Sequence, residues 1–155
     1  MPPNLTLFRA SVDDVFLLAP LFDAYRVFYG RPSDLKLAEK FLFDRLYANE
    51  SVIFFCRQLS SSSPAGFTQL YPSFSSASAG RIWILNDLFV SPEARRLSVA
   101  RVLIQAAHTH ARETGAVEVI LSTAHTNQTA QALYESIGYL QDAEFRTYSF
   151  AIRPA

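Results

Sequence analysis

Hydrophobic residues recur along the chain with two periods, which together predict alternating helices and strands. Apolar residues spaced by three or four positions mark one face of a helix. This spacing predicts helices over residues 11–29, 33–47, 99–114 and 127–137. Short runs rich in Val, Ile and Phe favour strands instead. They predict strands at residues 5–9, 51–58, 66–74, 81–90, 117–123, 139–141 and 145–152.

The resulting order, β-α-α-β-β-β-α-β-α-β-β, predicts an α/β fold. We expect a mixed sheet of about seven strands with about four helices, built from hairpins in the first half and strand–helix–strand crossovers in the second. Residues 81–90 are the most continuously apolar of the predicted strands. That pattern is typical of a strand covered on both faces. No long linker interrupts the pattern, so we expect residues 1–155 to form a single domain.

Polar and glycine residues mark the ends of the predicted helices. Asp34 and Asn127 precede apolar helical stripes and are residue types that cap helix N-termini. Asp13 and Asp14 would lie in the first turn of the first helix, where acidic side chains stabilise the helix dipole. Gly138 directly follows the last stripe and predicts the end of that helix.

Composition narrows the function classes. The chain has 155 residues, with 14 basic and 14 acidic side chains, so its formal net charge is zero. This balance provides no long-range attraction to nucleic acid or to an anionic membrane. No apolar run reaches the roughly 18 residues of a membrane-spanning helix, and the N-terminus lacks the pattern of a signal peptide. We therefore expect a cytoplasmic protein that binds neither partner.

The cysteine and histidines offer no metal site. Cys56 is the only cysteine and lies in an apolar run, which favours a buried structural thiol over a nucleophile. His108, His110 and His125 lack the spacing of metal ligands. We interpret all three as facing solvent.

Two segments carry the most specific patterns. Residues 127–139 follow N-x-x-A-x-x-L-Y-E-x-x-G-Y, with Ala130 one helical turn before Tyr134. Residues 85–103 combine an apolar strand, Pro92 and a basic helix start. A helix N-terminus with nearby arginines suits an anion such as a phosphate.

Both segments, and the predicted element order, resemble the Gcn5-related N-acetyltransferase (GNAT) family. The resemblance implies an enzyme that transfers an acetyl group from acetyl-CoA to an amine. It also implies that the turn after the strand holds the pyrophosphate of the coenzyme. The coenzyme contacts that it implies are Leu88, Phe89, Val90, Arg95, Arg96, Leu97, Ser98, Val99, Ala100, Arg101, Asn127, Ala130 and Tyr134.

The turn departs from the family pattern at two positions. Ser98 stands where the family has the middle glycine of [QR]-x-x-G-x-[GA], and Arg96 occupies another position that is often glycine. Glycine suits such a loop because backbone N–H groups approach the phosphate and some positions need positive φ. The serine hydroxyl can itself donate to a phosphate oxygen. We favour retained binding, and the alternative is a catalytically weak or inactive coenzyme-binding or ligand-sensing module.

The resemblance implies that Tyr134 protonates the leaving thiolate and that a backbone N–H near residues 88–90 stabilises the thioester oxygen. The amine must also lose a proton before it attacks. Asp87 is a candidate base, because a carboxylate in so apolar a strand is costly unless it has a role or a partner. Asn86 and Asp87 are expected on opposite faces of the strand. Asp87 as an internal structural anchor remains an equal alternative.

Aromatic residues suggest where the acceptor binds. Aromatic faces attract ammonium groups, so we take Tyr25, Tyr29 and Tyr71, with Asn86, as candidate substrate-binding residues. Residues 25–34 are the candidate specificity loop. For each aromatic residue taken singly, a place in the core remains the competing interpretation. The hypothesis is a small primary amine, polyamine-like or amino-acid-like, acetylated by a homodimer.

Overall fold

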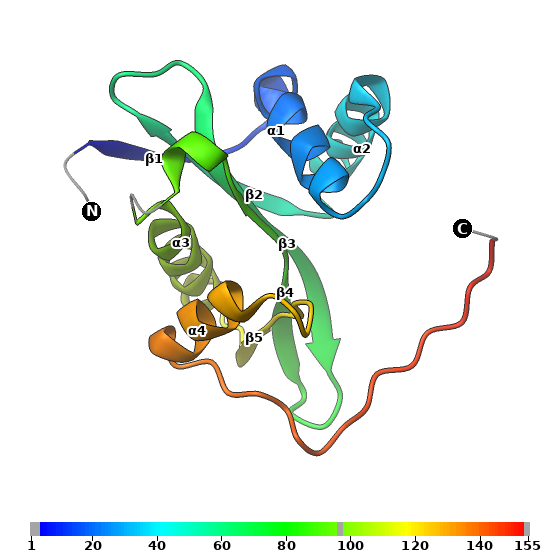
Figure 1. Ribbon diagram of the computed structural model, residues 1–155. Helices are drawn as coiled ribbons and strands as arrows, with labels where there is room; N and C mark the ends of the chain where they lie inside the picture. Colours follow the sequence, from blue (N-terminus) through cyan, green and yellow to red (C-terminus); the bar gives the residue numbers. More distant parts are fainter. Residues whose placement is uncertain (1–3, 96–97, 154–155) are drawn as a thin grey trace. The chain divides into compact units, whose positions relative to one another are not determined.

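The computed structural model describes residues 4–95 and 98–153, and the chain divides into two compact units. The first unit is Met1–Leu121 and the second is Ser122–Ala155 (Figure 1). Each unit is described in turn.

The first unit is built on a mixed five-stranded sheet. Its strands follow the order β1-β2-β3-β4-β5, with the first four antiparallel and β5 parallel to β4. The strands are β1 (Leu5–Arg9), β2 (Val52–Gln58), β3 (Pro64–Ser75), β4 (Gly80–Val90) and β5 (Glu118–Ile120). The helices of this unit are α1 (Val15–Phe28), α2 (Leu35–Tyr47) and α3 (Val99–Glu113), with short 3-10 turns at Val12–Asp14 and Pro92–Ala94.

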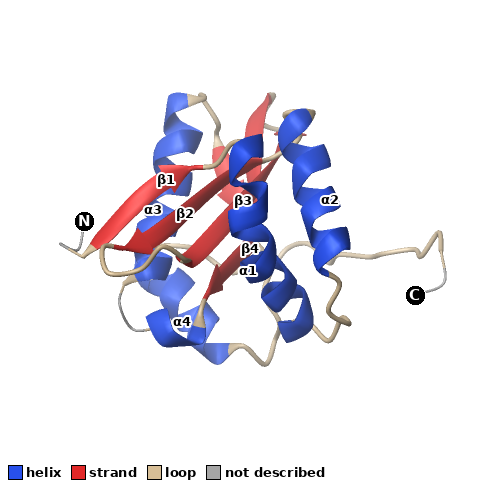
Figure 2. Cartoon of the chain, turned by 90° about the horizontal axis from the view of Figure 1, so that it is seen from above, coloured by secondary structure: helices blue, strands red, loops and turns tan. Residues whose placement is uncertain are grey.

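Helices cover both faces of this sheet. α1 and α2 lie on one face and α3 lies on the other (Figure 2). Successive side chains of a strand point to opposite faces. Phe55 therefore packs into the core under α1 and α2, whereas Cys56 packs into the core under α3. This alternation explains why β2 and β3 read as nearly continuous apolar runs.

Local capping signals are confirmed. Ser11 and Asp14 form a reciprocal capping box before α1. The Asp34 carboxylate accepts a hydrogen bond from the Leu37 N–H at 3.0 Å and caps α2. These side chains satisfy N–H groups that no helical carbonyl reaches, and so they fix where each helix begins.

Gly66 lets α3 lie close to the sheet. A Cβ at this position would come within 2.8 Å of both the Phe89 carbonyl oxygen and Val99 Cγ1. Gly66 pairs with Val90 across β3 and β4. The missing side chain therefore allows the first turn of α3 to pack against the end of β4.

The second unit contains α4 (Gln128–Ile137). Asn127 caps it, because its side-chain oxygen accepts a hydrogen bond from the Ala130 N–H at 3.2 Å. Gly138 follows α4 with a φ of +108°. Glycine adopts this left-handed conformation without strain, as the sequence predicted.

The prediction of strands near the C-terminus is wrong. Among the residues that it describes, no strand follows β5, so the sheet has five strands rather than about seven. The segments predicted as strands at Tyr139–Gln141 and Phe145–Ile152 are irregular, and β5 is shorter than residues 117–123. An apolar alternation makes a strand only where a neighbouring strand accepts its backbone hydrogen bonds, and the residues described supply no such neighbour.

No helix within residues 4–95 and 98–153 is both long enough and apolar enough to span a bilayer.

Candidate active site

A β-bulge shapes the middle of β4. Gln69 pairs with Asp87, but the next residue of β3, Leu70, pairs with Leu85. Asn86 is therefore an extra residue without a partner on β3. The bulge brings the Asn86 and Asp87 side chains together, with Asn86 Nδ2 donating to Asp87 Oδ1 at 2.9 Å. The prediction that they point to opposite faces is wrong, because a bulge interrupts the alternation of the strand.

Asp87 is a buried carboxylate that accepts hydrogen bonds from two side chains. It is 2% exposed. Gln69 Nε2 donates to its Oδ2 at 2.5 Å, and Asn86 Nδ2 donates to its Oδ1. The Tyr25 hydroxyl is near enough to lower the pKa of Asp87 as well. Burial raises the pKa of Asp87, and the donors oppose that shift only in part. The result is a carboxyl group that takes up a proton more readily than an exposed aspartate does.

Aromatic residues surround this carboxylate on the face that carries α1. Burial, followed by the charge of Asp87, raises the pKa values of Tyr25 and Tyr71, so both remain neutral phenols. The Tyr25 ring also packs edge-on against Phe67 at 5.9 Å between centroids. Tyr29 is 52% exposed and reaches this cluster through Tyr25, at 4.9 Å between ring centroids. Among the predicted substrate residues, Tyr25, Tyr71 and Asn86 therefore lie around Asp87, and Tyr29 lies outside them.

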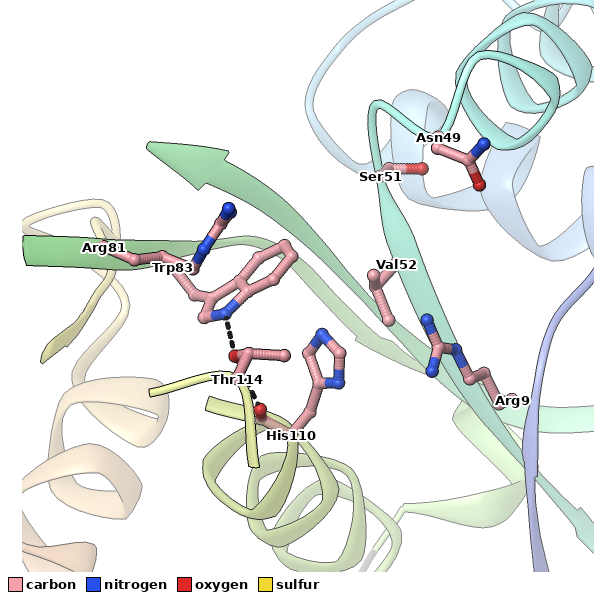
Figure 3. A pocket seen from close by; sticks show the side chains of 8 residues that line it. All are labelled: Arg9, Asn49, Ser51, Val52, Arg81, Trp83, His110 and Thr114. Atoms are coloured by element: carbon pink, nitrogen blue, oxygen red, sulfur yellow. Dashed lines mark hydrogen bonds between the residues drawn. The ribbon is translucent and has the colours of Figure 1, made fainter. Parts of the chain in front are cut away.

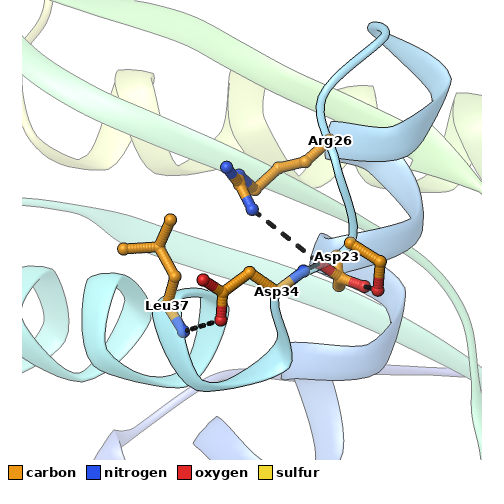
Figure 4. Close-up of polar contacts among 5 residues, drawn as sticks. Asp23, Arg26, Asp34 and Leu37 are labelled. Carbon is orange, nitrogen blue, oxygen red and sulfur yellow. Dashed lines mark hydrogen bonds and ion pairs between the residues drawn. The ribbon is translucent and has the colours of Figure 1, made fainter.

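The loop that leaves α1 is anchored beside this cluster. Asp23 is buried, and its carboxylate accepts hydrogen bonds from Ser33 Oγ at 2.5 Å and from the Asp34 N–H at 2.8 Å. Arg26 lies 3.8 Å from the same carboxylate (Figure 4). The Ser33 and Asp34 hydrogen bonds, in that order, lower the pKa of Asp23. This ionised aspartate holds the end of the predicted specificity loop, and no motif in the sequence indicated its role.

The end of β4 has one open edge. β5 pairs only with Ile82–Ile84 of β4. Leu88, Phe89 and Val90 pair with β3 on one side, and no strand in the described residues pairs with them on the other. Backbone N–H groups on such an edge are available to a carbonyl oxygen. Asp87 lies on this open stretch, directly before Leu88.

The turn from β4 into α3 ends in a left-handed serine. Ser98 has φ +62° and ψ +10°, and its side chain makes no capping hydrogen bond to α3. Ser98 therefore leaves the first-turn N–H groups of α3 without a side-chain cap of its own, and such a helix start suits an anion. Arg95 and Ser98 are exposed and Ala100 is partly buried, whereas the side chain of Val99 belongs to the core. Arg101 is exposed, and Arg96 and Leu97 lie outside the described residues.

The second unit carries the other predicted site residues. The Asn127 side chain is engaged as the cap of α4 through the Ala130 N–H. Tyr134 is partly buried and packs edge-on against Tyr139 at 5.8 Å between ring centroids. Burial, then Tyr134, raises the pKa of Tyr139 to about 12.

The structure confirms the prediction for the cysteine but not the prediction for His110. Cys56 is fully buried, and burial raises the pKa of its thiol to about 11, so it is a structural thiol as predicted. His110, by contrast, is only 6% exposed, so the prediction that it faces solvent is wrong. It belongs to the buried stripe of α3 with Leu103 and Ala107. No cluster of His, Cys, Asp and Glu side chains suited to a metal ion occurs in the part of the chain that is described.

Residues 18–139 match the family model of the Acetyltransferase (GNAT) family. The chain belongs to this family. It is 46% identical over 140 residues to the "Uncharacterized N-acetyltransferase YhfO" of Bacillus subtilis (strain 168), covering 90% of this chain and 93% of the relative. A crystal structure of a probable acetyltransferase is 47% identical and superposes with a TM-score of 0.90, covering 97% of this chain and 99% of the other.

A shorter similarity extends to yeast. The chain is 34% identical over 77 residues to the D-amino-acid N-acetyltransferase HPA3 of Saccharomyces cerevisiae (strain ATCC 204508 / S288c), covering 50% of this chain and 48% of the relative.

Membership makes the protein an acetyltransferase that uses acetyl-CoA as its donor. The residues present fit that donor at two places. Among the described residues, no strand pairs with the edge of Leu88–Val90 that faces away from β3, and the first turn of α3 receives no cap from the side chain of the left-handed Ser98.

Proposed function

We propose that this protein transfers an acetyl group to the primary amine of a small molecule, with Asp87 as the base and Tyr134 as the acid. The observation that carries the proposal is the buried Asp87 carboxylate, held by Gln69 and Asn86 and followed directly by Leu88–Val90 on the open edge of β4. A buried polar cluster of this kind is costly to build unless it serves chemistry or anchoring.

The proposed base has a suitable proton affinity. A free alkylamine is mostly protonated at neutral pH and has to lose a proton before it attacks a carbonyl. Because burial raises the pKa of Asp87, its carboxylate takes a proton more readily than an exposed aspartate. Asp87 receives this proton directly or through an ordered water. Gln69 and Asn86 then hold the carboxyl group in one orientation.

Acetyl-CoA supplies the acetyl group as a thioester. The N–H groups on the open edge of β4, at Leu88–Val90, are positioned to donate to a carbonyl oxygen that gains negative charge. The first turn of α3 and the Arg95 guanidinium suit the pyrophosphate, with Arg96, Leu97, Ser98, Val99, Ala100 and Arg101 as further predicted contacts. Tyr134 gives its phenolic proton to the thiolate, with Asn127 and Ala130 on the same helix.

The substrate class follows from the chemistry around Asp87. Neutral tyrosines and a carboxylate attract an ammonium group, and Tyr25 and Tyr71 provide the tyrosines. The acceptor is therefore amino-acid-like or polyamine-like. The yeast relative is named as a D-amino-acid N-acetyltransferase, which supports the amino-acid-like choice.

The competing function, a coenzyme-binding module without turnover, rested on the missing loop glycines. Ser98 takes a left-handed conformation that glycine would adopt without strain. The serine therefore supplies the backbone geometry of the loop, which favours retained donor binding over its loss.

The test is release of free thiol from acetyl-CoA in the presence of a panel of amino acids, polyamines and other primary amines. The proposal expects at least one amine to be acetylated. Tyr134→Phe should lower kcat at least tenfold while the Kd for acetyl-CoA stays within about threefold. The control is Tyr47→Phe, since Tyr47 lies on α2 and is 72% exposed.

Two outcomes contradict parts of the proposal separately. Donor binding without turnover on any amine supports the binding module. Turnover that survives Tyr134→Phe assigns the acid to another group.

The proposal also includes a single domain over residues 1–155, a homodimer and a cytoplasmic location. Four apolar side chains in residues 145–152 are between 78% and 87% exposed, which supports a protein partner for this segment. They are Phe145, Tyr148, Phe150 and Ile152.

A further inference from the structure

A polar pocket lies in the first unit, near the C-terminal end of α3. The turn that suits acetyl-CoA lies at the N-terminal end of the same helix. The pocket has a volume of about 460 Å³, and it opens between α3 and the starts of β2 and β4 (Figure 3). His110 is eleven residues beyond Val99, which at 1.5 Å per residue places it roughly 16 Å along the helix axis. The pocket is therefore separate from the turn that suits acetyl-CoA. It is lined by Arg9, Asn49, Ser51, Val52, Arg81, Trp83, His110 and Thr114.

The pocket carries an excess of positive charge. Arg9 and Arg81 come from β1 and β4, and among the described residues neither has a carboxylate within ion-pair distance. The two arginines lie on opposite sides of the pocket, with His110 and Val52 between them (Figure 3). Both arginines act on His110. Burial lowers the pKa of His110 most, Arg9 lowers it further, and Arg81 adds to the shift. Glu113 is the only group that opposes it there.

The floor of the pocket holds polar atoms without partners. His110 and Ser51 are 6% and 7% exposed. Within the described part of the chain, His110 Nε2 and Ser51 Oγ make no hydrogen bond. Buried polar groups in folded proteins are nearly always hydrogen-bonded, and a ligand in this cavity can supply the partners that these two atoms lack.

The wall of the pocket is rigid. Trp83 Nε1 donates to Thr114 Oγ1 at 2.8 Å, and that hydroxyl donates to the His110 carbonyl at 2.8 Å. The Trp83 and His110 rings lie 4.8 Å apart between centroids. The Arg81 guanidinium lies 5.6 Å from the Trp83 ring centroid. These contacts hold the imidazole and one guanidinium in place before any ligand arrives.

We propose that this pocket binds a small dicarboxylate. The two arginines would each take one carboxylate from opposite sides, because guanidinium groups match carboxylate geometry. His110 Nε2 and Ser51 Oγ would contact the ligand from the floor, and Trp83 and Val52 would pack against its carbon chain. A single phosphate would fill only part of a pocket of about 460 Å³.

Trp83 makes the proposal measurable. It is the only tryptophan in the chain and it lines the pocket, so intrinsic fluorescence reports occupancy directly. The experiment titrates the full-length protein with succinate at constant ionic strength, with acetate and inorganic phosphate as matched anions. The expected result is a saturable change with succinate and an apparent Kd about tenfold weaker or more for acetate and phosphate. The succinate Kd should not change when acetyl-CoA is present at saturation.

Variants separate this site from general charge effects. Arg9→Gln and Arg81→Gln should each raise the succinate Kd about tenfold or more. Arg57→Gln should leave it unchanged, since Arg57 lies on β2 over the Phe8 ring and does not line the pocket. Because Arg81 touches Trp83, Kd is taken from the midpoint of each titration and not from its amplitude.

Four results would overturn the proposal. They are the absence of a saturable signal up to about 50 mM succinate, equal binding of acetate or phosphate, equal loss of affinity in Arg57→Gln, and competition by acetyl-CoA. The imidazole resonances of His110, followed by NMR during the same titration, give a second readout that should saturate at the same succinate concentration.

Discussion

Gln69 lies directly opposite Asp87 across β3 and β4, and its side-chain amide donates to the buried carboxylate at 2.5 Å. Gln69 is fully buried, and its Oε1 has no hydrogen-bond partner among the described residues. The amide nitrogen is thus used to hold Asp87, while the amide oxygen is left unsatisfied. The pair links the fold to the proposed chemistry, because the register of one bulge decides which side chain meets the carboxylate.

Removal of the charge at Asp87 should stabilise the protein at neutral pH. The pKa of Asp87 is raised in the folded state. Between the ordinary aspartate pKa and this raised value, the folded chain therefore binds more protons than the unfolded chain. The free energy of unfolding falls as pH rises through this window, because the buried carboxyl group has to ionise. Asp87→Asn should therefore raise Tm at pH 7. The gain should disappear in acid, below the ordinary pKa of aspartate. Thermal unfolding of the variant and the wild type between pH 3 and 8 measures both.

Asp23→Asn is the matched control, and it should change Tm at pH 7 in the opposite direction. Hydrogen bonds from Ser33 and Asp34 lower the pKa of Asp23, so its contribution to stability is present above the ordinary aspartate pKa and is lost as pH falls through the folded one. Asp23→Asn should lower Tm at pH 7, with the difference shrinking in acid. A Tm shift of the same sign for both variants would contradict these assignments.

Ser98→Gly should stabilise the donor turn. A left-handed φ costs a residue with a side chain about 1 kcal/mol relative to glycine, and Ser98 has φ +62°. We expect a small rise in Tm and a Kd for acetyl-CoA that is unchanged or lower, measured by isothermal titration. Ala79→Gly is the control, since Ala79 also has positive φ but lies in the turn between β3 and β4. It should raise Tm without affecting coenzyme binding. A large loss of affinity in Ser98→Gly would instead assign the hydroxyl a direct contact.

Gly66→Ala should destabilise the first unit by about 1–3 kcal/mol, the usual cost of overpacking. The new Cβ would meet the Phe89 carbonyl oxygen and Val99 Cγ1, both at 2.8 Å. Chemical denaturation measures the change. In the double variant with Val99→Ala, the two effects should be less than additive, because one of the clashes is removed. Full additivity would show that α3 does not pack on Gly66 as described.

The sequence predicted helix ends correctly where a single residue caps or ends the helix. Asp34 and Asn127 cap their helices and Gly138 ends α4, because side-chain oxygens and positive φ act within a few residues. His110 also had a readable signal that was missed. It lies four residues before Thr114 and seven after Leu103, on the same helical stripe that buries Ala107.

The pairing register of distant strands could not be predicted from the sequence. The bulge at Asn86 depends on how β3 and β4 pair, so neither the meeting of Asn86 with Asp87 nor the role of Gln69 follows from the spacing of residues. The alternation in residues 145–152 likewise predicted a strand, but alternation does not specify a partner for its backbone. The pocket at Arg9, Arg81 and His110 joins three elements that are far apart in the chain.

The pH dependence of kcat/KM for wild type and Asp87→Asn, with the acetyl-CoA Kd measured in parallel, tests the proposed mechanism most directly. Because the base must be ionised, the wild-type rate should rise with pH through an apparent pKa above that of an ordinary aspartate. Asp87→Asn should keep its donor affinity and lose roughly 100- to 10,000-fold in rate, without that rise. A variant that stays within about threefold of the wild-type rate, with the same pH profile, would show that Asp87 is a structural anchor and that the base lies elsewhere.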